Sequence, residues 1–286
     1  MSKVAAPSLP ATLRLGPVHL AVTDLERAAE FYRRSIGLRE HARGNGRSVL
    51  GAGAEDLLVL IEEPAARPAG RHAGLYHFAL LHPSRLELSR AARRLLDTGT
   101  PISGASDHGI SEAIYLPDPE GNGIELAADR GRERWGDLGN PASIGPAPLD
   151  LQGLLALSED EEPRGQVDPD VVVGHLHLHV GDVGRALAFY RDLVGFEVMT
   201  QFPGAAFIAA GGYHHHLGLN TWRGEGVPAA PPGGVGLRRW TVVLGPEEDL
   251  EALRQRLQDG GSEVAELEGG VAAVDPSGNP VLFTAG

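Results

Sequence analysis

The chain has 286 residues, of which 42% are hydrophobic and 22% are charged, a composition ordinary for a globular protein of one or two domains. Because cysteine is absent, disulfides, thiolate metal sites and cysteine nucleophiles are excluded. The formal net charge of −13 argues against a nucleic-acid partner and gives no reason to bind an anionic membrane. No segment predicts a secretory leader or a membrane span, so we expect a cytoplasmic protein.

Four related segments follow one another along the chain. Residues 18–40 and 176–198 are identical at ten of 23 aligned positions, and residues 74–99 share their pattern with residues 236–260. Each segment predicts an alternating strand, an amphipathic helix and about three further strands separated by glycine-rich turns. In the first segment Asp24 can cap the helix and Gly37 can end it. We therefore predict an α+β fold of four βαβββ units with curved mixed sheets.

The four units are expected to form two halves. Residues 14–128 would hold units 1 and 2, which form an N-terminal domain with a metal site, and residues 171–286 would hold units 3 and 4. Residues 129–170 predict a linker because they are rich in proline, glycine and charge, with a short apolar helix within 151–157.

Two histidines and one glutamate in the first half predict a metal site. Strand alternation places His19 on the face away from the helices, on the concave side of the sheet, and His77 opens a similar strand. Glu125 lies in an apolar strand, where a lone carboxylate is costly unless it is paired or binds a metal. Two imidazoles and one carboxylate on one face are the arrangement used by non-haem Fe(II) oxygenases.

Residues 108–125 read HGISEAIYLPDPEGNGIE. This spacing resembles the signature of extradiol ring-cleavage dioxygenases of the vicinal-oxygen-chelate superfamily. The segments GLYHFALL, GHLHLHV and GGYHHHLGLNTW are also similar to bacterial catechol-2,3-dioxygenase-like proteins, and the resemblance spans all four units. It implies two vicinal-oxygen-chelate (glyoxalase-like) domains.

The resemblance also implies roles for individual residues. His19, His77 and Glu125 match the metal ligands. Tyr115 matches a tyrosine that hydrogen-bonds the substrate oxygen or the oxygen adduct, and His108 matches a histidine near the substrate oxygens. For the family's distal acid–base histidine, His72 is the nearby candidate. The implied cofactor is Fe(II), with Mn(II) or another divalent metal as alternatives. The implied substrates are a small aromatic diol and O₂, as in aromatic hydrocarbon catabolism. A homo-oligomer is left open.

The second half is expected to lack a complete site. The positions equivalent to the three ligands there are His177, Trp240 and Leu282, so two ligands are missing. The clusters His175/His177/His179 and 214–216 are therefore interpreted as polar packing or an interface, in preference to a second metal site.

Two other functions remain open on the same fold. A glyoxalase-like metal-dependent isomerase or lyase would need a fourth protein ligand, for which Glu62 and Glu63 are the candidates. A non-catalytic ligand-binding resistance protein would use the cleft alone, and an intact ligand triad argues against it. Fold by itself does not decide among these functions.

Overall fold

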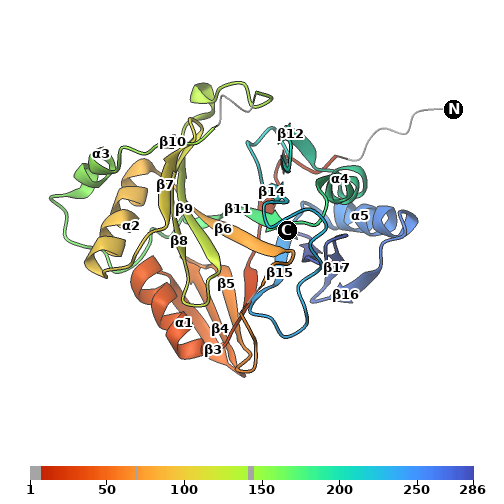
Figure 1. Cartoon of the computed structure of the whole chain (residues 1–286), viewed down its shortest axis with the longest axis horizontal. Coiled ribbons are helices and arrows are strands. Elements are labelled where there is room, and N and C mark those ends of the chain that lie inside the picture. Colours follow the sequence, from red (N-terminus) through yellow and green to blue (C-terminus); the bar gives the residue numbers. More distant parts are fainter. Residues whose placement is uncertain (1–7, 69, 141–144) are drawn as a thin grey trace.

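The computed structural model describes residues 8–68, 70–140 and 145–286 (Figure 1). It contains two mixed sheets of nine strands each, with helices packed against them. The α+β class and the curved mixed sheets predicted from the sequence are confirmed.

The first sheet combines units 1 and 4. Its strand order is β16-β17-β18-β15-β2-β5-β4-β3, and β1 pairs with β15 outside this path. Its strands are β1 (Arg14–Leu15), β2 (Val18–Val22), β3 (Arg39–Gly44), β4 (Arg47–Ala52), β5 (Glu55–Glu62), β15 (Gly236–Val243), β16 (Val264–Leu267), β17 (Gly270–Val274) and β18 (Pro280–Thr284).

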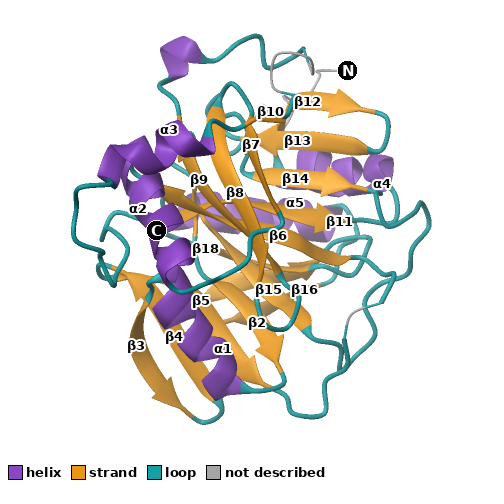
Figure 2. Cartoon of the chain, turned by 60° about the vertical axis from the view of Figure 1, so that its left-hand side comes forward, coloured by secondary structure: helices purple, strands orange, loops and turns teal. Residues whose placement is uncertain are grey.

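The second sheet combines units 2 and 3, in the order β10-β7-β8-β9-β6-β11-β14-β13-β12. Strands β12, β13 and β14 lie side by side at one end of this sheet (Figure 2). Its strands are β6 (Gly74–His82), β7 (Gly104–Asp107), β8 (Ser111–Pro117), β9 (Gly123–Asp129), β10 (Ala147–Pro148), β11 (Val172–His179), β12 (Glu197–Phe202), β13 (Ala205–Ala209) and β14 (Leu217–Asn220).

Each unit contributes one main helix. Helix α1 contacts β4 and β5, α2 contacts β6 and β9, α4 contacts β14, and α5 contacts β16 and β17. Helices α1 and α4 continue as π-helical turns, and the predicted linker helix is present as α3. The helices are α1 (Leu25–Phe31) with η1 (Tyr32–Ile36), α2 (Arg85–Asp97), η2 (Arg132–Arg134), α3 (Leu151–Leu155) with η4 (Ala156–Ser158), α4 (Val183–Leu187) with η5 (Ala188–Val194), and α5 (Glu247–Asp259).

The repeat has a physical counterpart in two equivalent turns. Asp118 accepts hydrogen bonds from its own turn and from the Tyr32 hydroxyl, at 2.9 Å, inside the protein. Asp275 accepts the same set of bonds in unit 4, with the Tyr190 hydroxyl at 3.2 Å. These bonds tie unit 1 to unit 2 and unit 3 to unit 4, although strand pairing joins the units differently.

Strand pairing therefore crosses the two halves of the sequence. Antiparallel pairing of β2 with β15 joins units 1 and 4, and antiparallel pairing of β6 with β11 joins units 2 and 3. One contiguous apolar core runs through both sheets. The boundaries expected at 14–128, 129–170 and 171–286 stay predictions. Within the described ranges, no helix combines the length and apolar character needed to cross a bilayer.

Candidate functional site

Three buried side chains converge on the concave face of the second sheet. They are His77 on β6, Glu125 on β9 and His175 on β11, and one ligand atom from each lies within 4.8 Å of the other two. The Nε2 atoms of both histidines are 3.0 Å from Oε2 of Glu125. Among the described residues, no other group of three or more such side chains meets at this spacing.

The register of three adjacent strands explains this convergence. On one side of β6, Ala79 pairs with Glu125, and on the other side it pairs with His175. His77 lies two residues before Ala79, so its side chain projects from the same face. All three ligand side chains therefore project from neighbouring backbone positions and converge on one point.

The distances fit a bound divalent metal. An octahedral ion with ligand bonds of about 2.1 Å separates neighbouring ligand atoms by about 3.0 Å. The two Nε2–Oε2 distances of 3.0 Å have this length. Imidazole nitrogen and carboxylate oxygen suit Fe(II), Mn(II) and other divalent ions of the first transition row.

The charges of the cluster suit the same ion. Burial alone would raise the pKa of Glu125, but His175 and His77 outweigh burial and hold that pKa well below its ordinary value. Burial lowers the pKa of His77 despite the nearby carboxylate. A neutral imidazole and an ionised carboxylate are the forms that donate electron pairs to a metal.

The structure places His19 away from this cluster. This residue does face the concave side of its sheet, as alternation indicated, but β2 belongs to the first sheet, where His19 pairs with Arg239. His175 occupies the third position of the cluster. The site is thus built from units 2 and 3, and not from units 1 and 2 as expected.

A cavity of about 620 Å³ opens onto the cluster. Aromatic side chains form much of its wall, and Trp222 at its mouth is 53% exposed. Tyr76 and Trp222 meet edge to face, with ring centroids 5.4 Å apart. The lining residues are Tyr76, His77, Ser106, His108, Ile110, Ser111, Tyr115, Glu125, Gly145, Pro146, His175, His177, Phe202, Phe207, His215 and Trp222.

His108 and Tyr115 form a pair in this cavity. Nε2 of His108 is 2.9 Å from the Tyr115 hydroxyl. Strands β8 and β9 pair as an antiparallel hairpin, and its register places Tyr115 directly opposite Glu125. Burial, reinforced by the charge of Glu125, raises the pKa of Tyr115 far above its ordinary value, so the phenol stays protonated. The structure thus brings Tyr115, His108, His77 and Glu125 together, as the sequence predicted.

His72 does not reach this site. It lies on the loop before β6, where its carbonyl accepts a hydrogen bond from Arg223, and it is absent from the cavity wall. Two histidines that the sequence analysis interpreted as packing residues, His177 and His215, line the cavity instead. The His215 ring lies 4.2 Å from that of His175, and Nε2 of His177 is buried without a hydrogen-bond partner.

The remaining histidines of the two clusters have structural partners. His179 is hydrogen-bonded to Asn220 at 2.7 Å, His214 contacts Asp129 at 2.9 Å, and Nδ1 of His216 accepts a hydrogen bond from the Ala210 amide at 3.2 Å. A packing interpretation therefore suits these three, whereas the alternating face of β11 was the sequence signal that could have identified His175 and His177.

The candidates for a fourth ligand lie away from the cluster. Glu62 ends β5 in the first sheet and accepts a hydrogen bond from the Leu25 amide. Glu63 forms a bidentate ion pair with Arg238, with N–O distances of 2.8 and 2.6 Å.

A family model and a known protein match this chain over most of its length. The family model described as "Glyoxalase/Bleomycin resistance protein/Dioxygenase superfamily" matches residues 14–126 and 172–283. A protein of Bacillus subtilis (strain 168) named "Catechol-2,3-dioxygenase" is 40% identical over 276 residues, which cover 94% of this chain and 96% of the relative.

Solved structures share the fold at low sequence identity. A putative dioxygenase from Bacillus subtilis subsp. subtilis str. 168 superposes with a TM-score of 0.71 at 13% identity, covering 98% of this chain and 86% of the other. Glyoxalase I from Zea mays gives a TM-score of 0.61 at 18% identity, covering 96% and 92%. The cppA protein from Streptococcus pneumoniae TIGR4 gives 0.63 at 14% identity, covering 98% and 100%.

Proposed function

We propose that this chain, which belongs to the Glyoxalase/Bleomycin resistance protein/Dioxygenase superfamily, is a metal-dependent extradiol dioxygenase that opens a catechol-type ring with O₂. The observation that carries the proposal is the buried His77–Glu125–His175 cluster at the base of an aromatic-lined cavity. Its support includes the 40% identity to a relative named catechol-2,3-dioxygenase.

His77, His175 and Glu125 would hold the metal, which we propose to be Fe(II), with Mn(II) or another divalent ion as alternatives. When bound, such an ion supplies open coordination positions for a diol and for O₂, and a path for electrons between them. Because His77, Glu125 and His175 all line the cavity, the substrates would reach the metal from the cavity.

The protein's own groups would handle the protons of the diol. Binding a catechol as an anion requires a base, and Nε2 of His177 is a buried nitrogen with no partner at the cavity wall. The protonated Tyr115 hydroxyl and Nε2 of His108, which are 2.9 Å apart, can hydrogen-bond a substrate oxygen and return a proton to it. His215 is a second base within the same wall.

The cavity would orient the ring and select its substituents. Tyr76, Phe207 and Trp222 present aromatic surface to a flat apolar ligand, and aromatic pairs favour offset or edge-to-face packing. A volume of about 620 Å³ is in the range that encloses drug-sized molecules. We therefore expect a catechol that carries a substituent to be preferred over unsubstituted catechol.

The glyoxalase-like alternative depended on Glu62 or Glu63 as a fourth ligand. Both lie in or beside the first sheet, and Glu63 is held by Arg238. No fourth ligand side chain joins the cluster among the described residues, which favours the open coordination positions of a dioxygenase. The compartment, a cytoplasmic one, and the oligomeric state stay predictions.

The test is oxygen consumption by the metal-loaded protein. The protein is purified without oxygen, loaded with Fe(II) and mixed with a substituted catechol and air, while O₂ uptake and a yellow ring-fission product are followed. Wild type and the His19→Ala control are expected to consume O₂, and Glu125→Ala and His175→Ala are expected to be inactive. Stoichiometric metal binding without O₂ uptake on any catechol would refute the proposal.

A further inference from the structure

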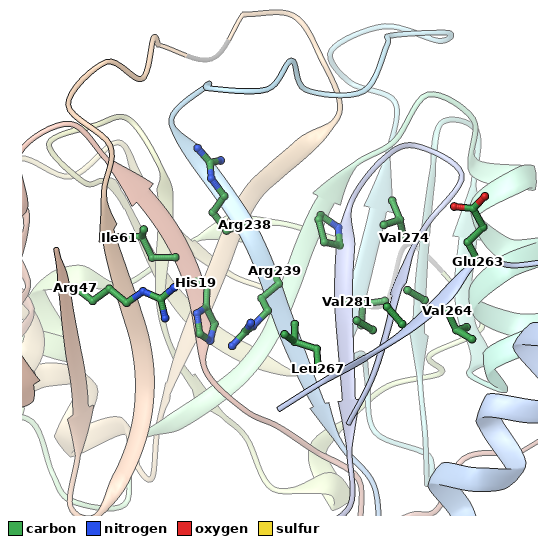
Figure 3. A pocket seen from close by; sticks show the side chains of 14 residues that line it. His19, Arg47, Ile61, Arg238, Arg239, Glu263, Val264, Leu267, Val274 and Val281 are labelled. Atoms are coloured by element: carbon green, nitrogen blue, oxygen red, sulfur yellow. The ribbon is translucent and has the colours of Figure 1, made fainter. Parts of the chain in front are cut away.

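A second cavity lies on the concave face of the first sheet, where the repeat has placed the counterpart of the metal cluster (Figure 3). Its volume is about 400 Å³. His19, expected from the sequence to be a metal ligand, lines this cavity, and none of the residues that line it belongs to the cavity of the proposed dioxygenase reaction.

The two cavities occupy equivalent strand pairs but carry opposite chemistry. In the second sheet His77 faces His177 across the central strands, and in the first sheet His19 faces Arg239, so the counterpart of His77 is Arg239 and not Trp240, the position expected from the sequence. In the first sheet Ala21, which lies two residues after His19, pairs with Ile61 of β5. Thr241, which lies two residues after Arg239, pairs with Leu282 of β18. Neither position holds a carboxylate like Glu125, so a metal cation has no anionic ligand there.

One end of this cavity is cationic. Arg47, His19 and Arg239 point toward one another there (Figure 3). Arg47 forms no ion pair among the described residues, and its charge makes a smaller contribution than that of Arg239 to lowering the pKa of the Glu268 carboxyl. One Nη of Arg239 forms an ion pair with Glu268 at 2.5 Å, while Nε of Arg239 is buried without a hydrogen-bond partner. Because a guanidinium has five N–H donors, Arg239 retains capacity for a further anion.

His19 adds a neutral hydrogen-bonding group to this end. Burial, followed by the positive charge of Arg239, lowers the pKa of His19 to about 4. By contrast, Arg238 is already neutralised by its two-pronged pair with Glu63. The unbalanced positive charge at this end of the cavity therefore comes from Arg47. Arg239 contributes N–H hydrogen-bond donors to the same end.

The rest of the cavity is apolar. Val264, Leu267, Val274 and Val281 line it, and Val274 is 55% exposed. Glu263 lies at the far end from Arg47 (Figure 3). A ligand with an anionic head and an apolar body matches this polarity, and a second negative charge near Glu263 would be disfavoured.

We propose that this cavity is a binding site for an apolar monocarboxylate, with its carboxylate held by Arg47 and Arg239 and its hydrocarbon body lying along Val264 and Val281. A charge-assisted hydrogen bond from the free Nε would satisfy a donor that is otherwise costly to bury. The strand pair that uses imidazoles and a carboxylate to hold a cation in one sheet would thus use guanidinium groups to hold an anion in the other.

Octanoate is the probe, and titration calorimetry of the full-length, metal-loaded protein is the assay. We expect one saturable octanoate site per chain, at least about tenfold weaker binding for Arg239→Gln and Arg47→Gln, and no saturable binding of 1-octanol or the dicarboxylate suberate. Val274→Glu, which adds negative charge to an exposed position in the cavity, is expected to weaken octanoate as well.

Two variants provide matched controls. Arg33→Gln removes an arginine from a surface pair with Glu30 and is expected to bind octanoate like wild type. Glu125→Gln disables the metal cluster and is expected to bind octanoate unchanged, so the outcome is independent of the dioxygenase proposal.

Several results would overturn the assignment. These are an absence of saturable binding to wild type, equal binding by Arg47→Gln and wild type, or loss of binding only in Glu125→Gln, which would place octanoate at the metal cluster. Light scattering provides a further test. If the wild-type protein self-associates and Arg47→Glu abolishes this self-association, the cavity is an interface between copies of the chain, which would also overturn the proposal.

Discussion

Replacing His82 with leucine is expected to make the stability of the protein less sensitive to acid. His82 is the last residue of β6, the strand that carries His77, and it is 2% exposed. Both of its ring nitrogens are buried without a hydrogen-bond partner. Burial, with a smaller contribution from the charge of Arg94, lowers its pKa from 6.5 to about 3.

The size of the effect follows from proton linkage. The unfolded chain protonates this histidine below about pH 6.5, while the folded protein keeps it neutral down to about pH 3. Stability is therefore lost as the pH falls through this window, by up to about 1.4 kcal/mol for each pH unit. Between pH 8 and pH 5, His82 alone removes about 2 kcal/mol from the free energy of unfolding.

Urea unfolding at pH 8 and pH 5, with the same metal load in both proteins, measures this difference. His82→Leu should lose about 2 kcal/mol less than wild type between the two pH values. At pH 8 the variant should be at least as stable as wild type, because leucine removes two unsatisfied polar atoms. Equal pH dependence in the two proteins, or a large loss at pH 8, would refute the reasoning.

Three further predictions concern the candidate site and its support. His175→Ala should weaken Fe(II) binding at least about 100-fold while His19→Ala leaves it unchanged, as measured by competition with a chromophoric chelator, and the reverse order would contradict the assigned cluster. Tyr115→Phe should lower kcat roughly 100-fold with metal content unchanged, because a proton donor and not a ligand is removed, and an unaltered kcat would exclude that role. Asp118→Ala should destabilise the protein by about 2–4 kcal/mol in urea unfolding, because the buried Tyr32 hydroxyl and the turn amides lose their acceptor, and a change below about 0.5 kcal/mol would show that these bonds contribute little.

Local chemistry made part of this site predictable from the sequence. Residues 118–123 are of turn-forming types and connect the two strands whose register sets Tyr115 opposite Glu125, and strand alternation indicated that His77 and His19 face the concave side. The helix cap at Asp24 and the helix end at Gly37 were readable for the same reason, since each depends on residues close in sequence.

The pairing of units was not predictable in this way. Alternation gives the face of a strand but not its neighbour, and the long linker lets unit 2 pair with unit 3. The repeat aligned His19 with His177, whereas the cluster uses His175, two residues earlier on the same face. Irregularities in β11 on either side of His175 and His177 set the register, and only the first of them, at Gly174, coincides with a residue type that favours a bulge.

The pairing of β6 with β11 also bears on how the site could be taken apart and rebuilt. Each half of the sequence carries only part of the cluster, with His77 and Glu125 before the linker and His175 after it. Two polypeptides separated within residues 129–170 would each be unable to assemble the site alone. Recombining them would restore it only through association, so the recovery of metal binding should follow second-order kinetics in fragment concentration. The site would then act as a reporter of complementation between the two halves.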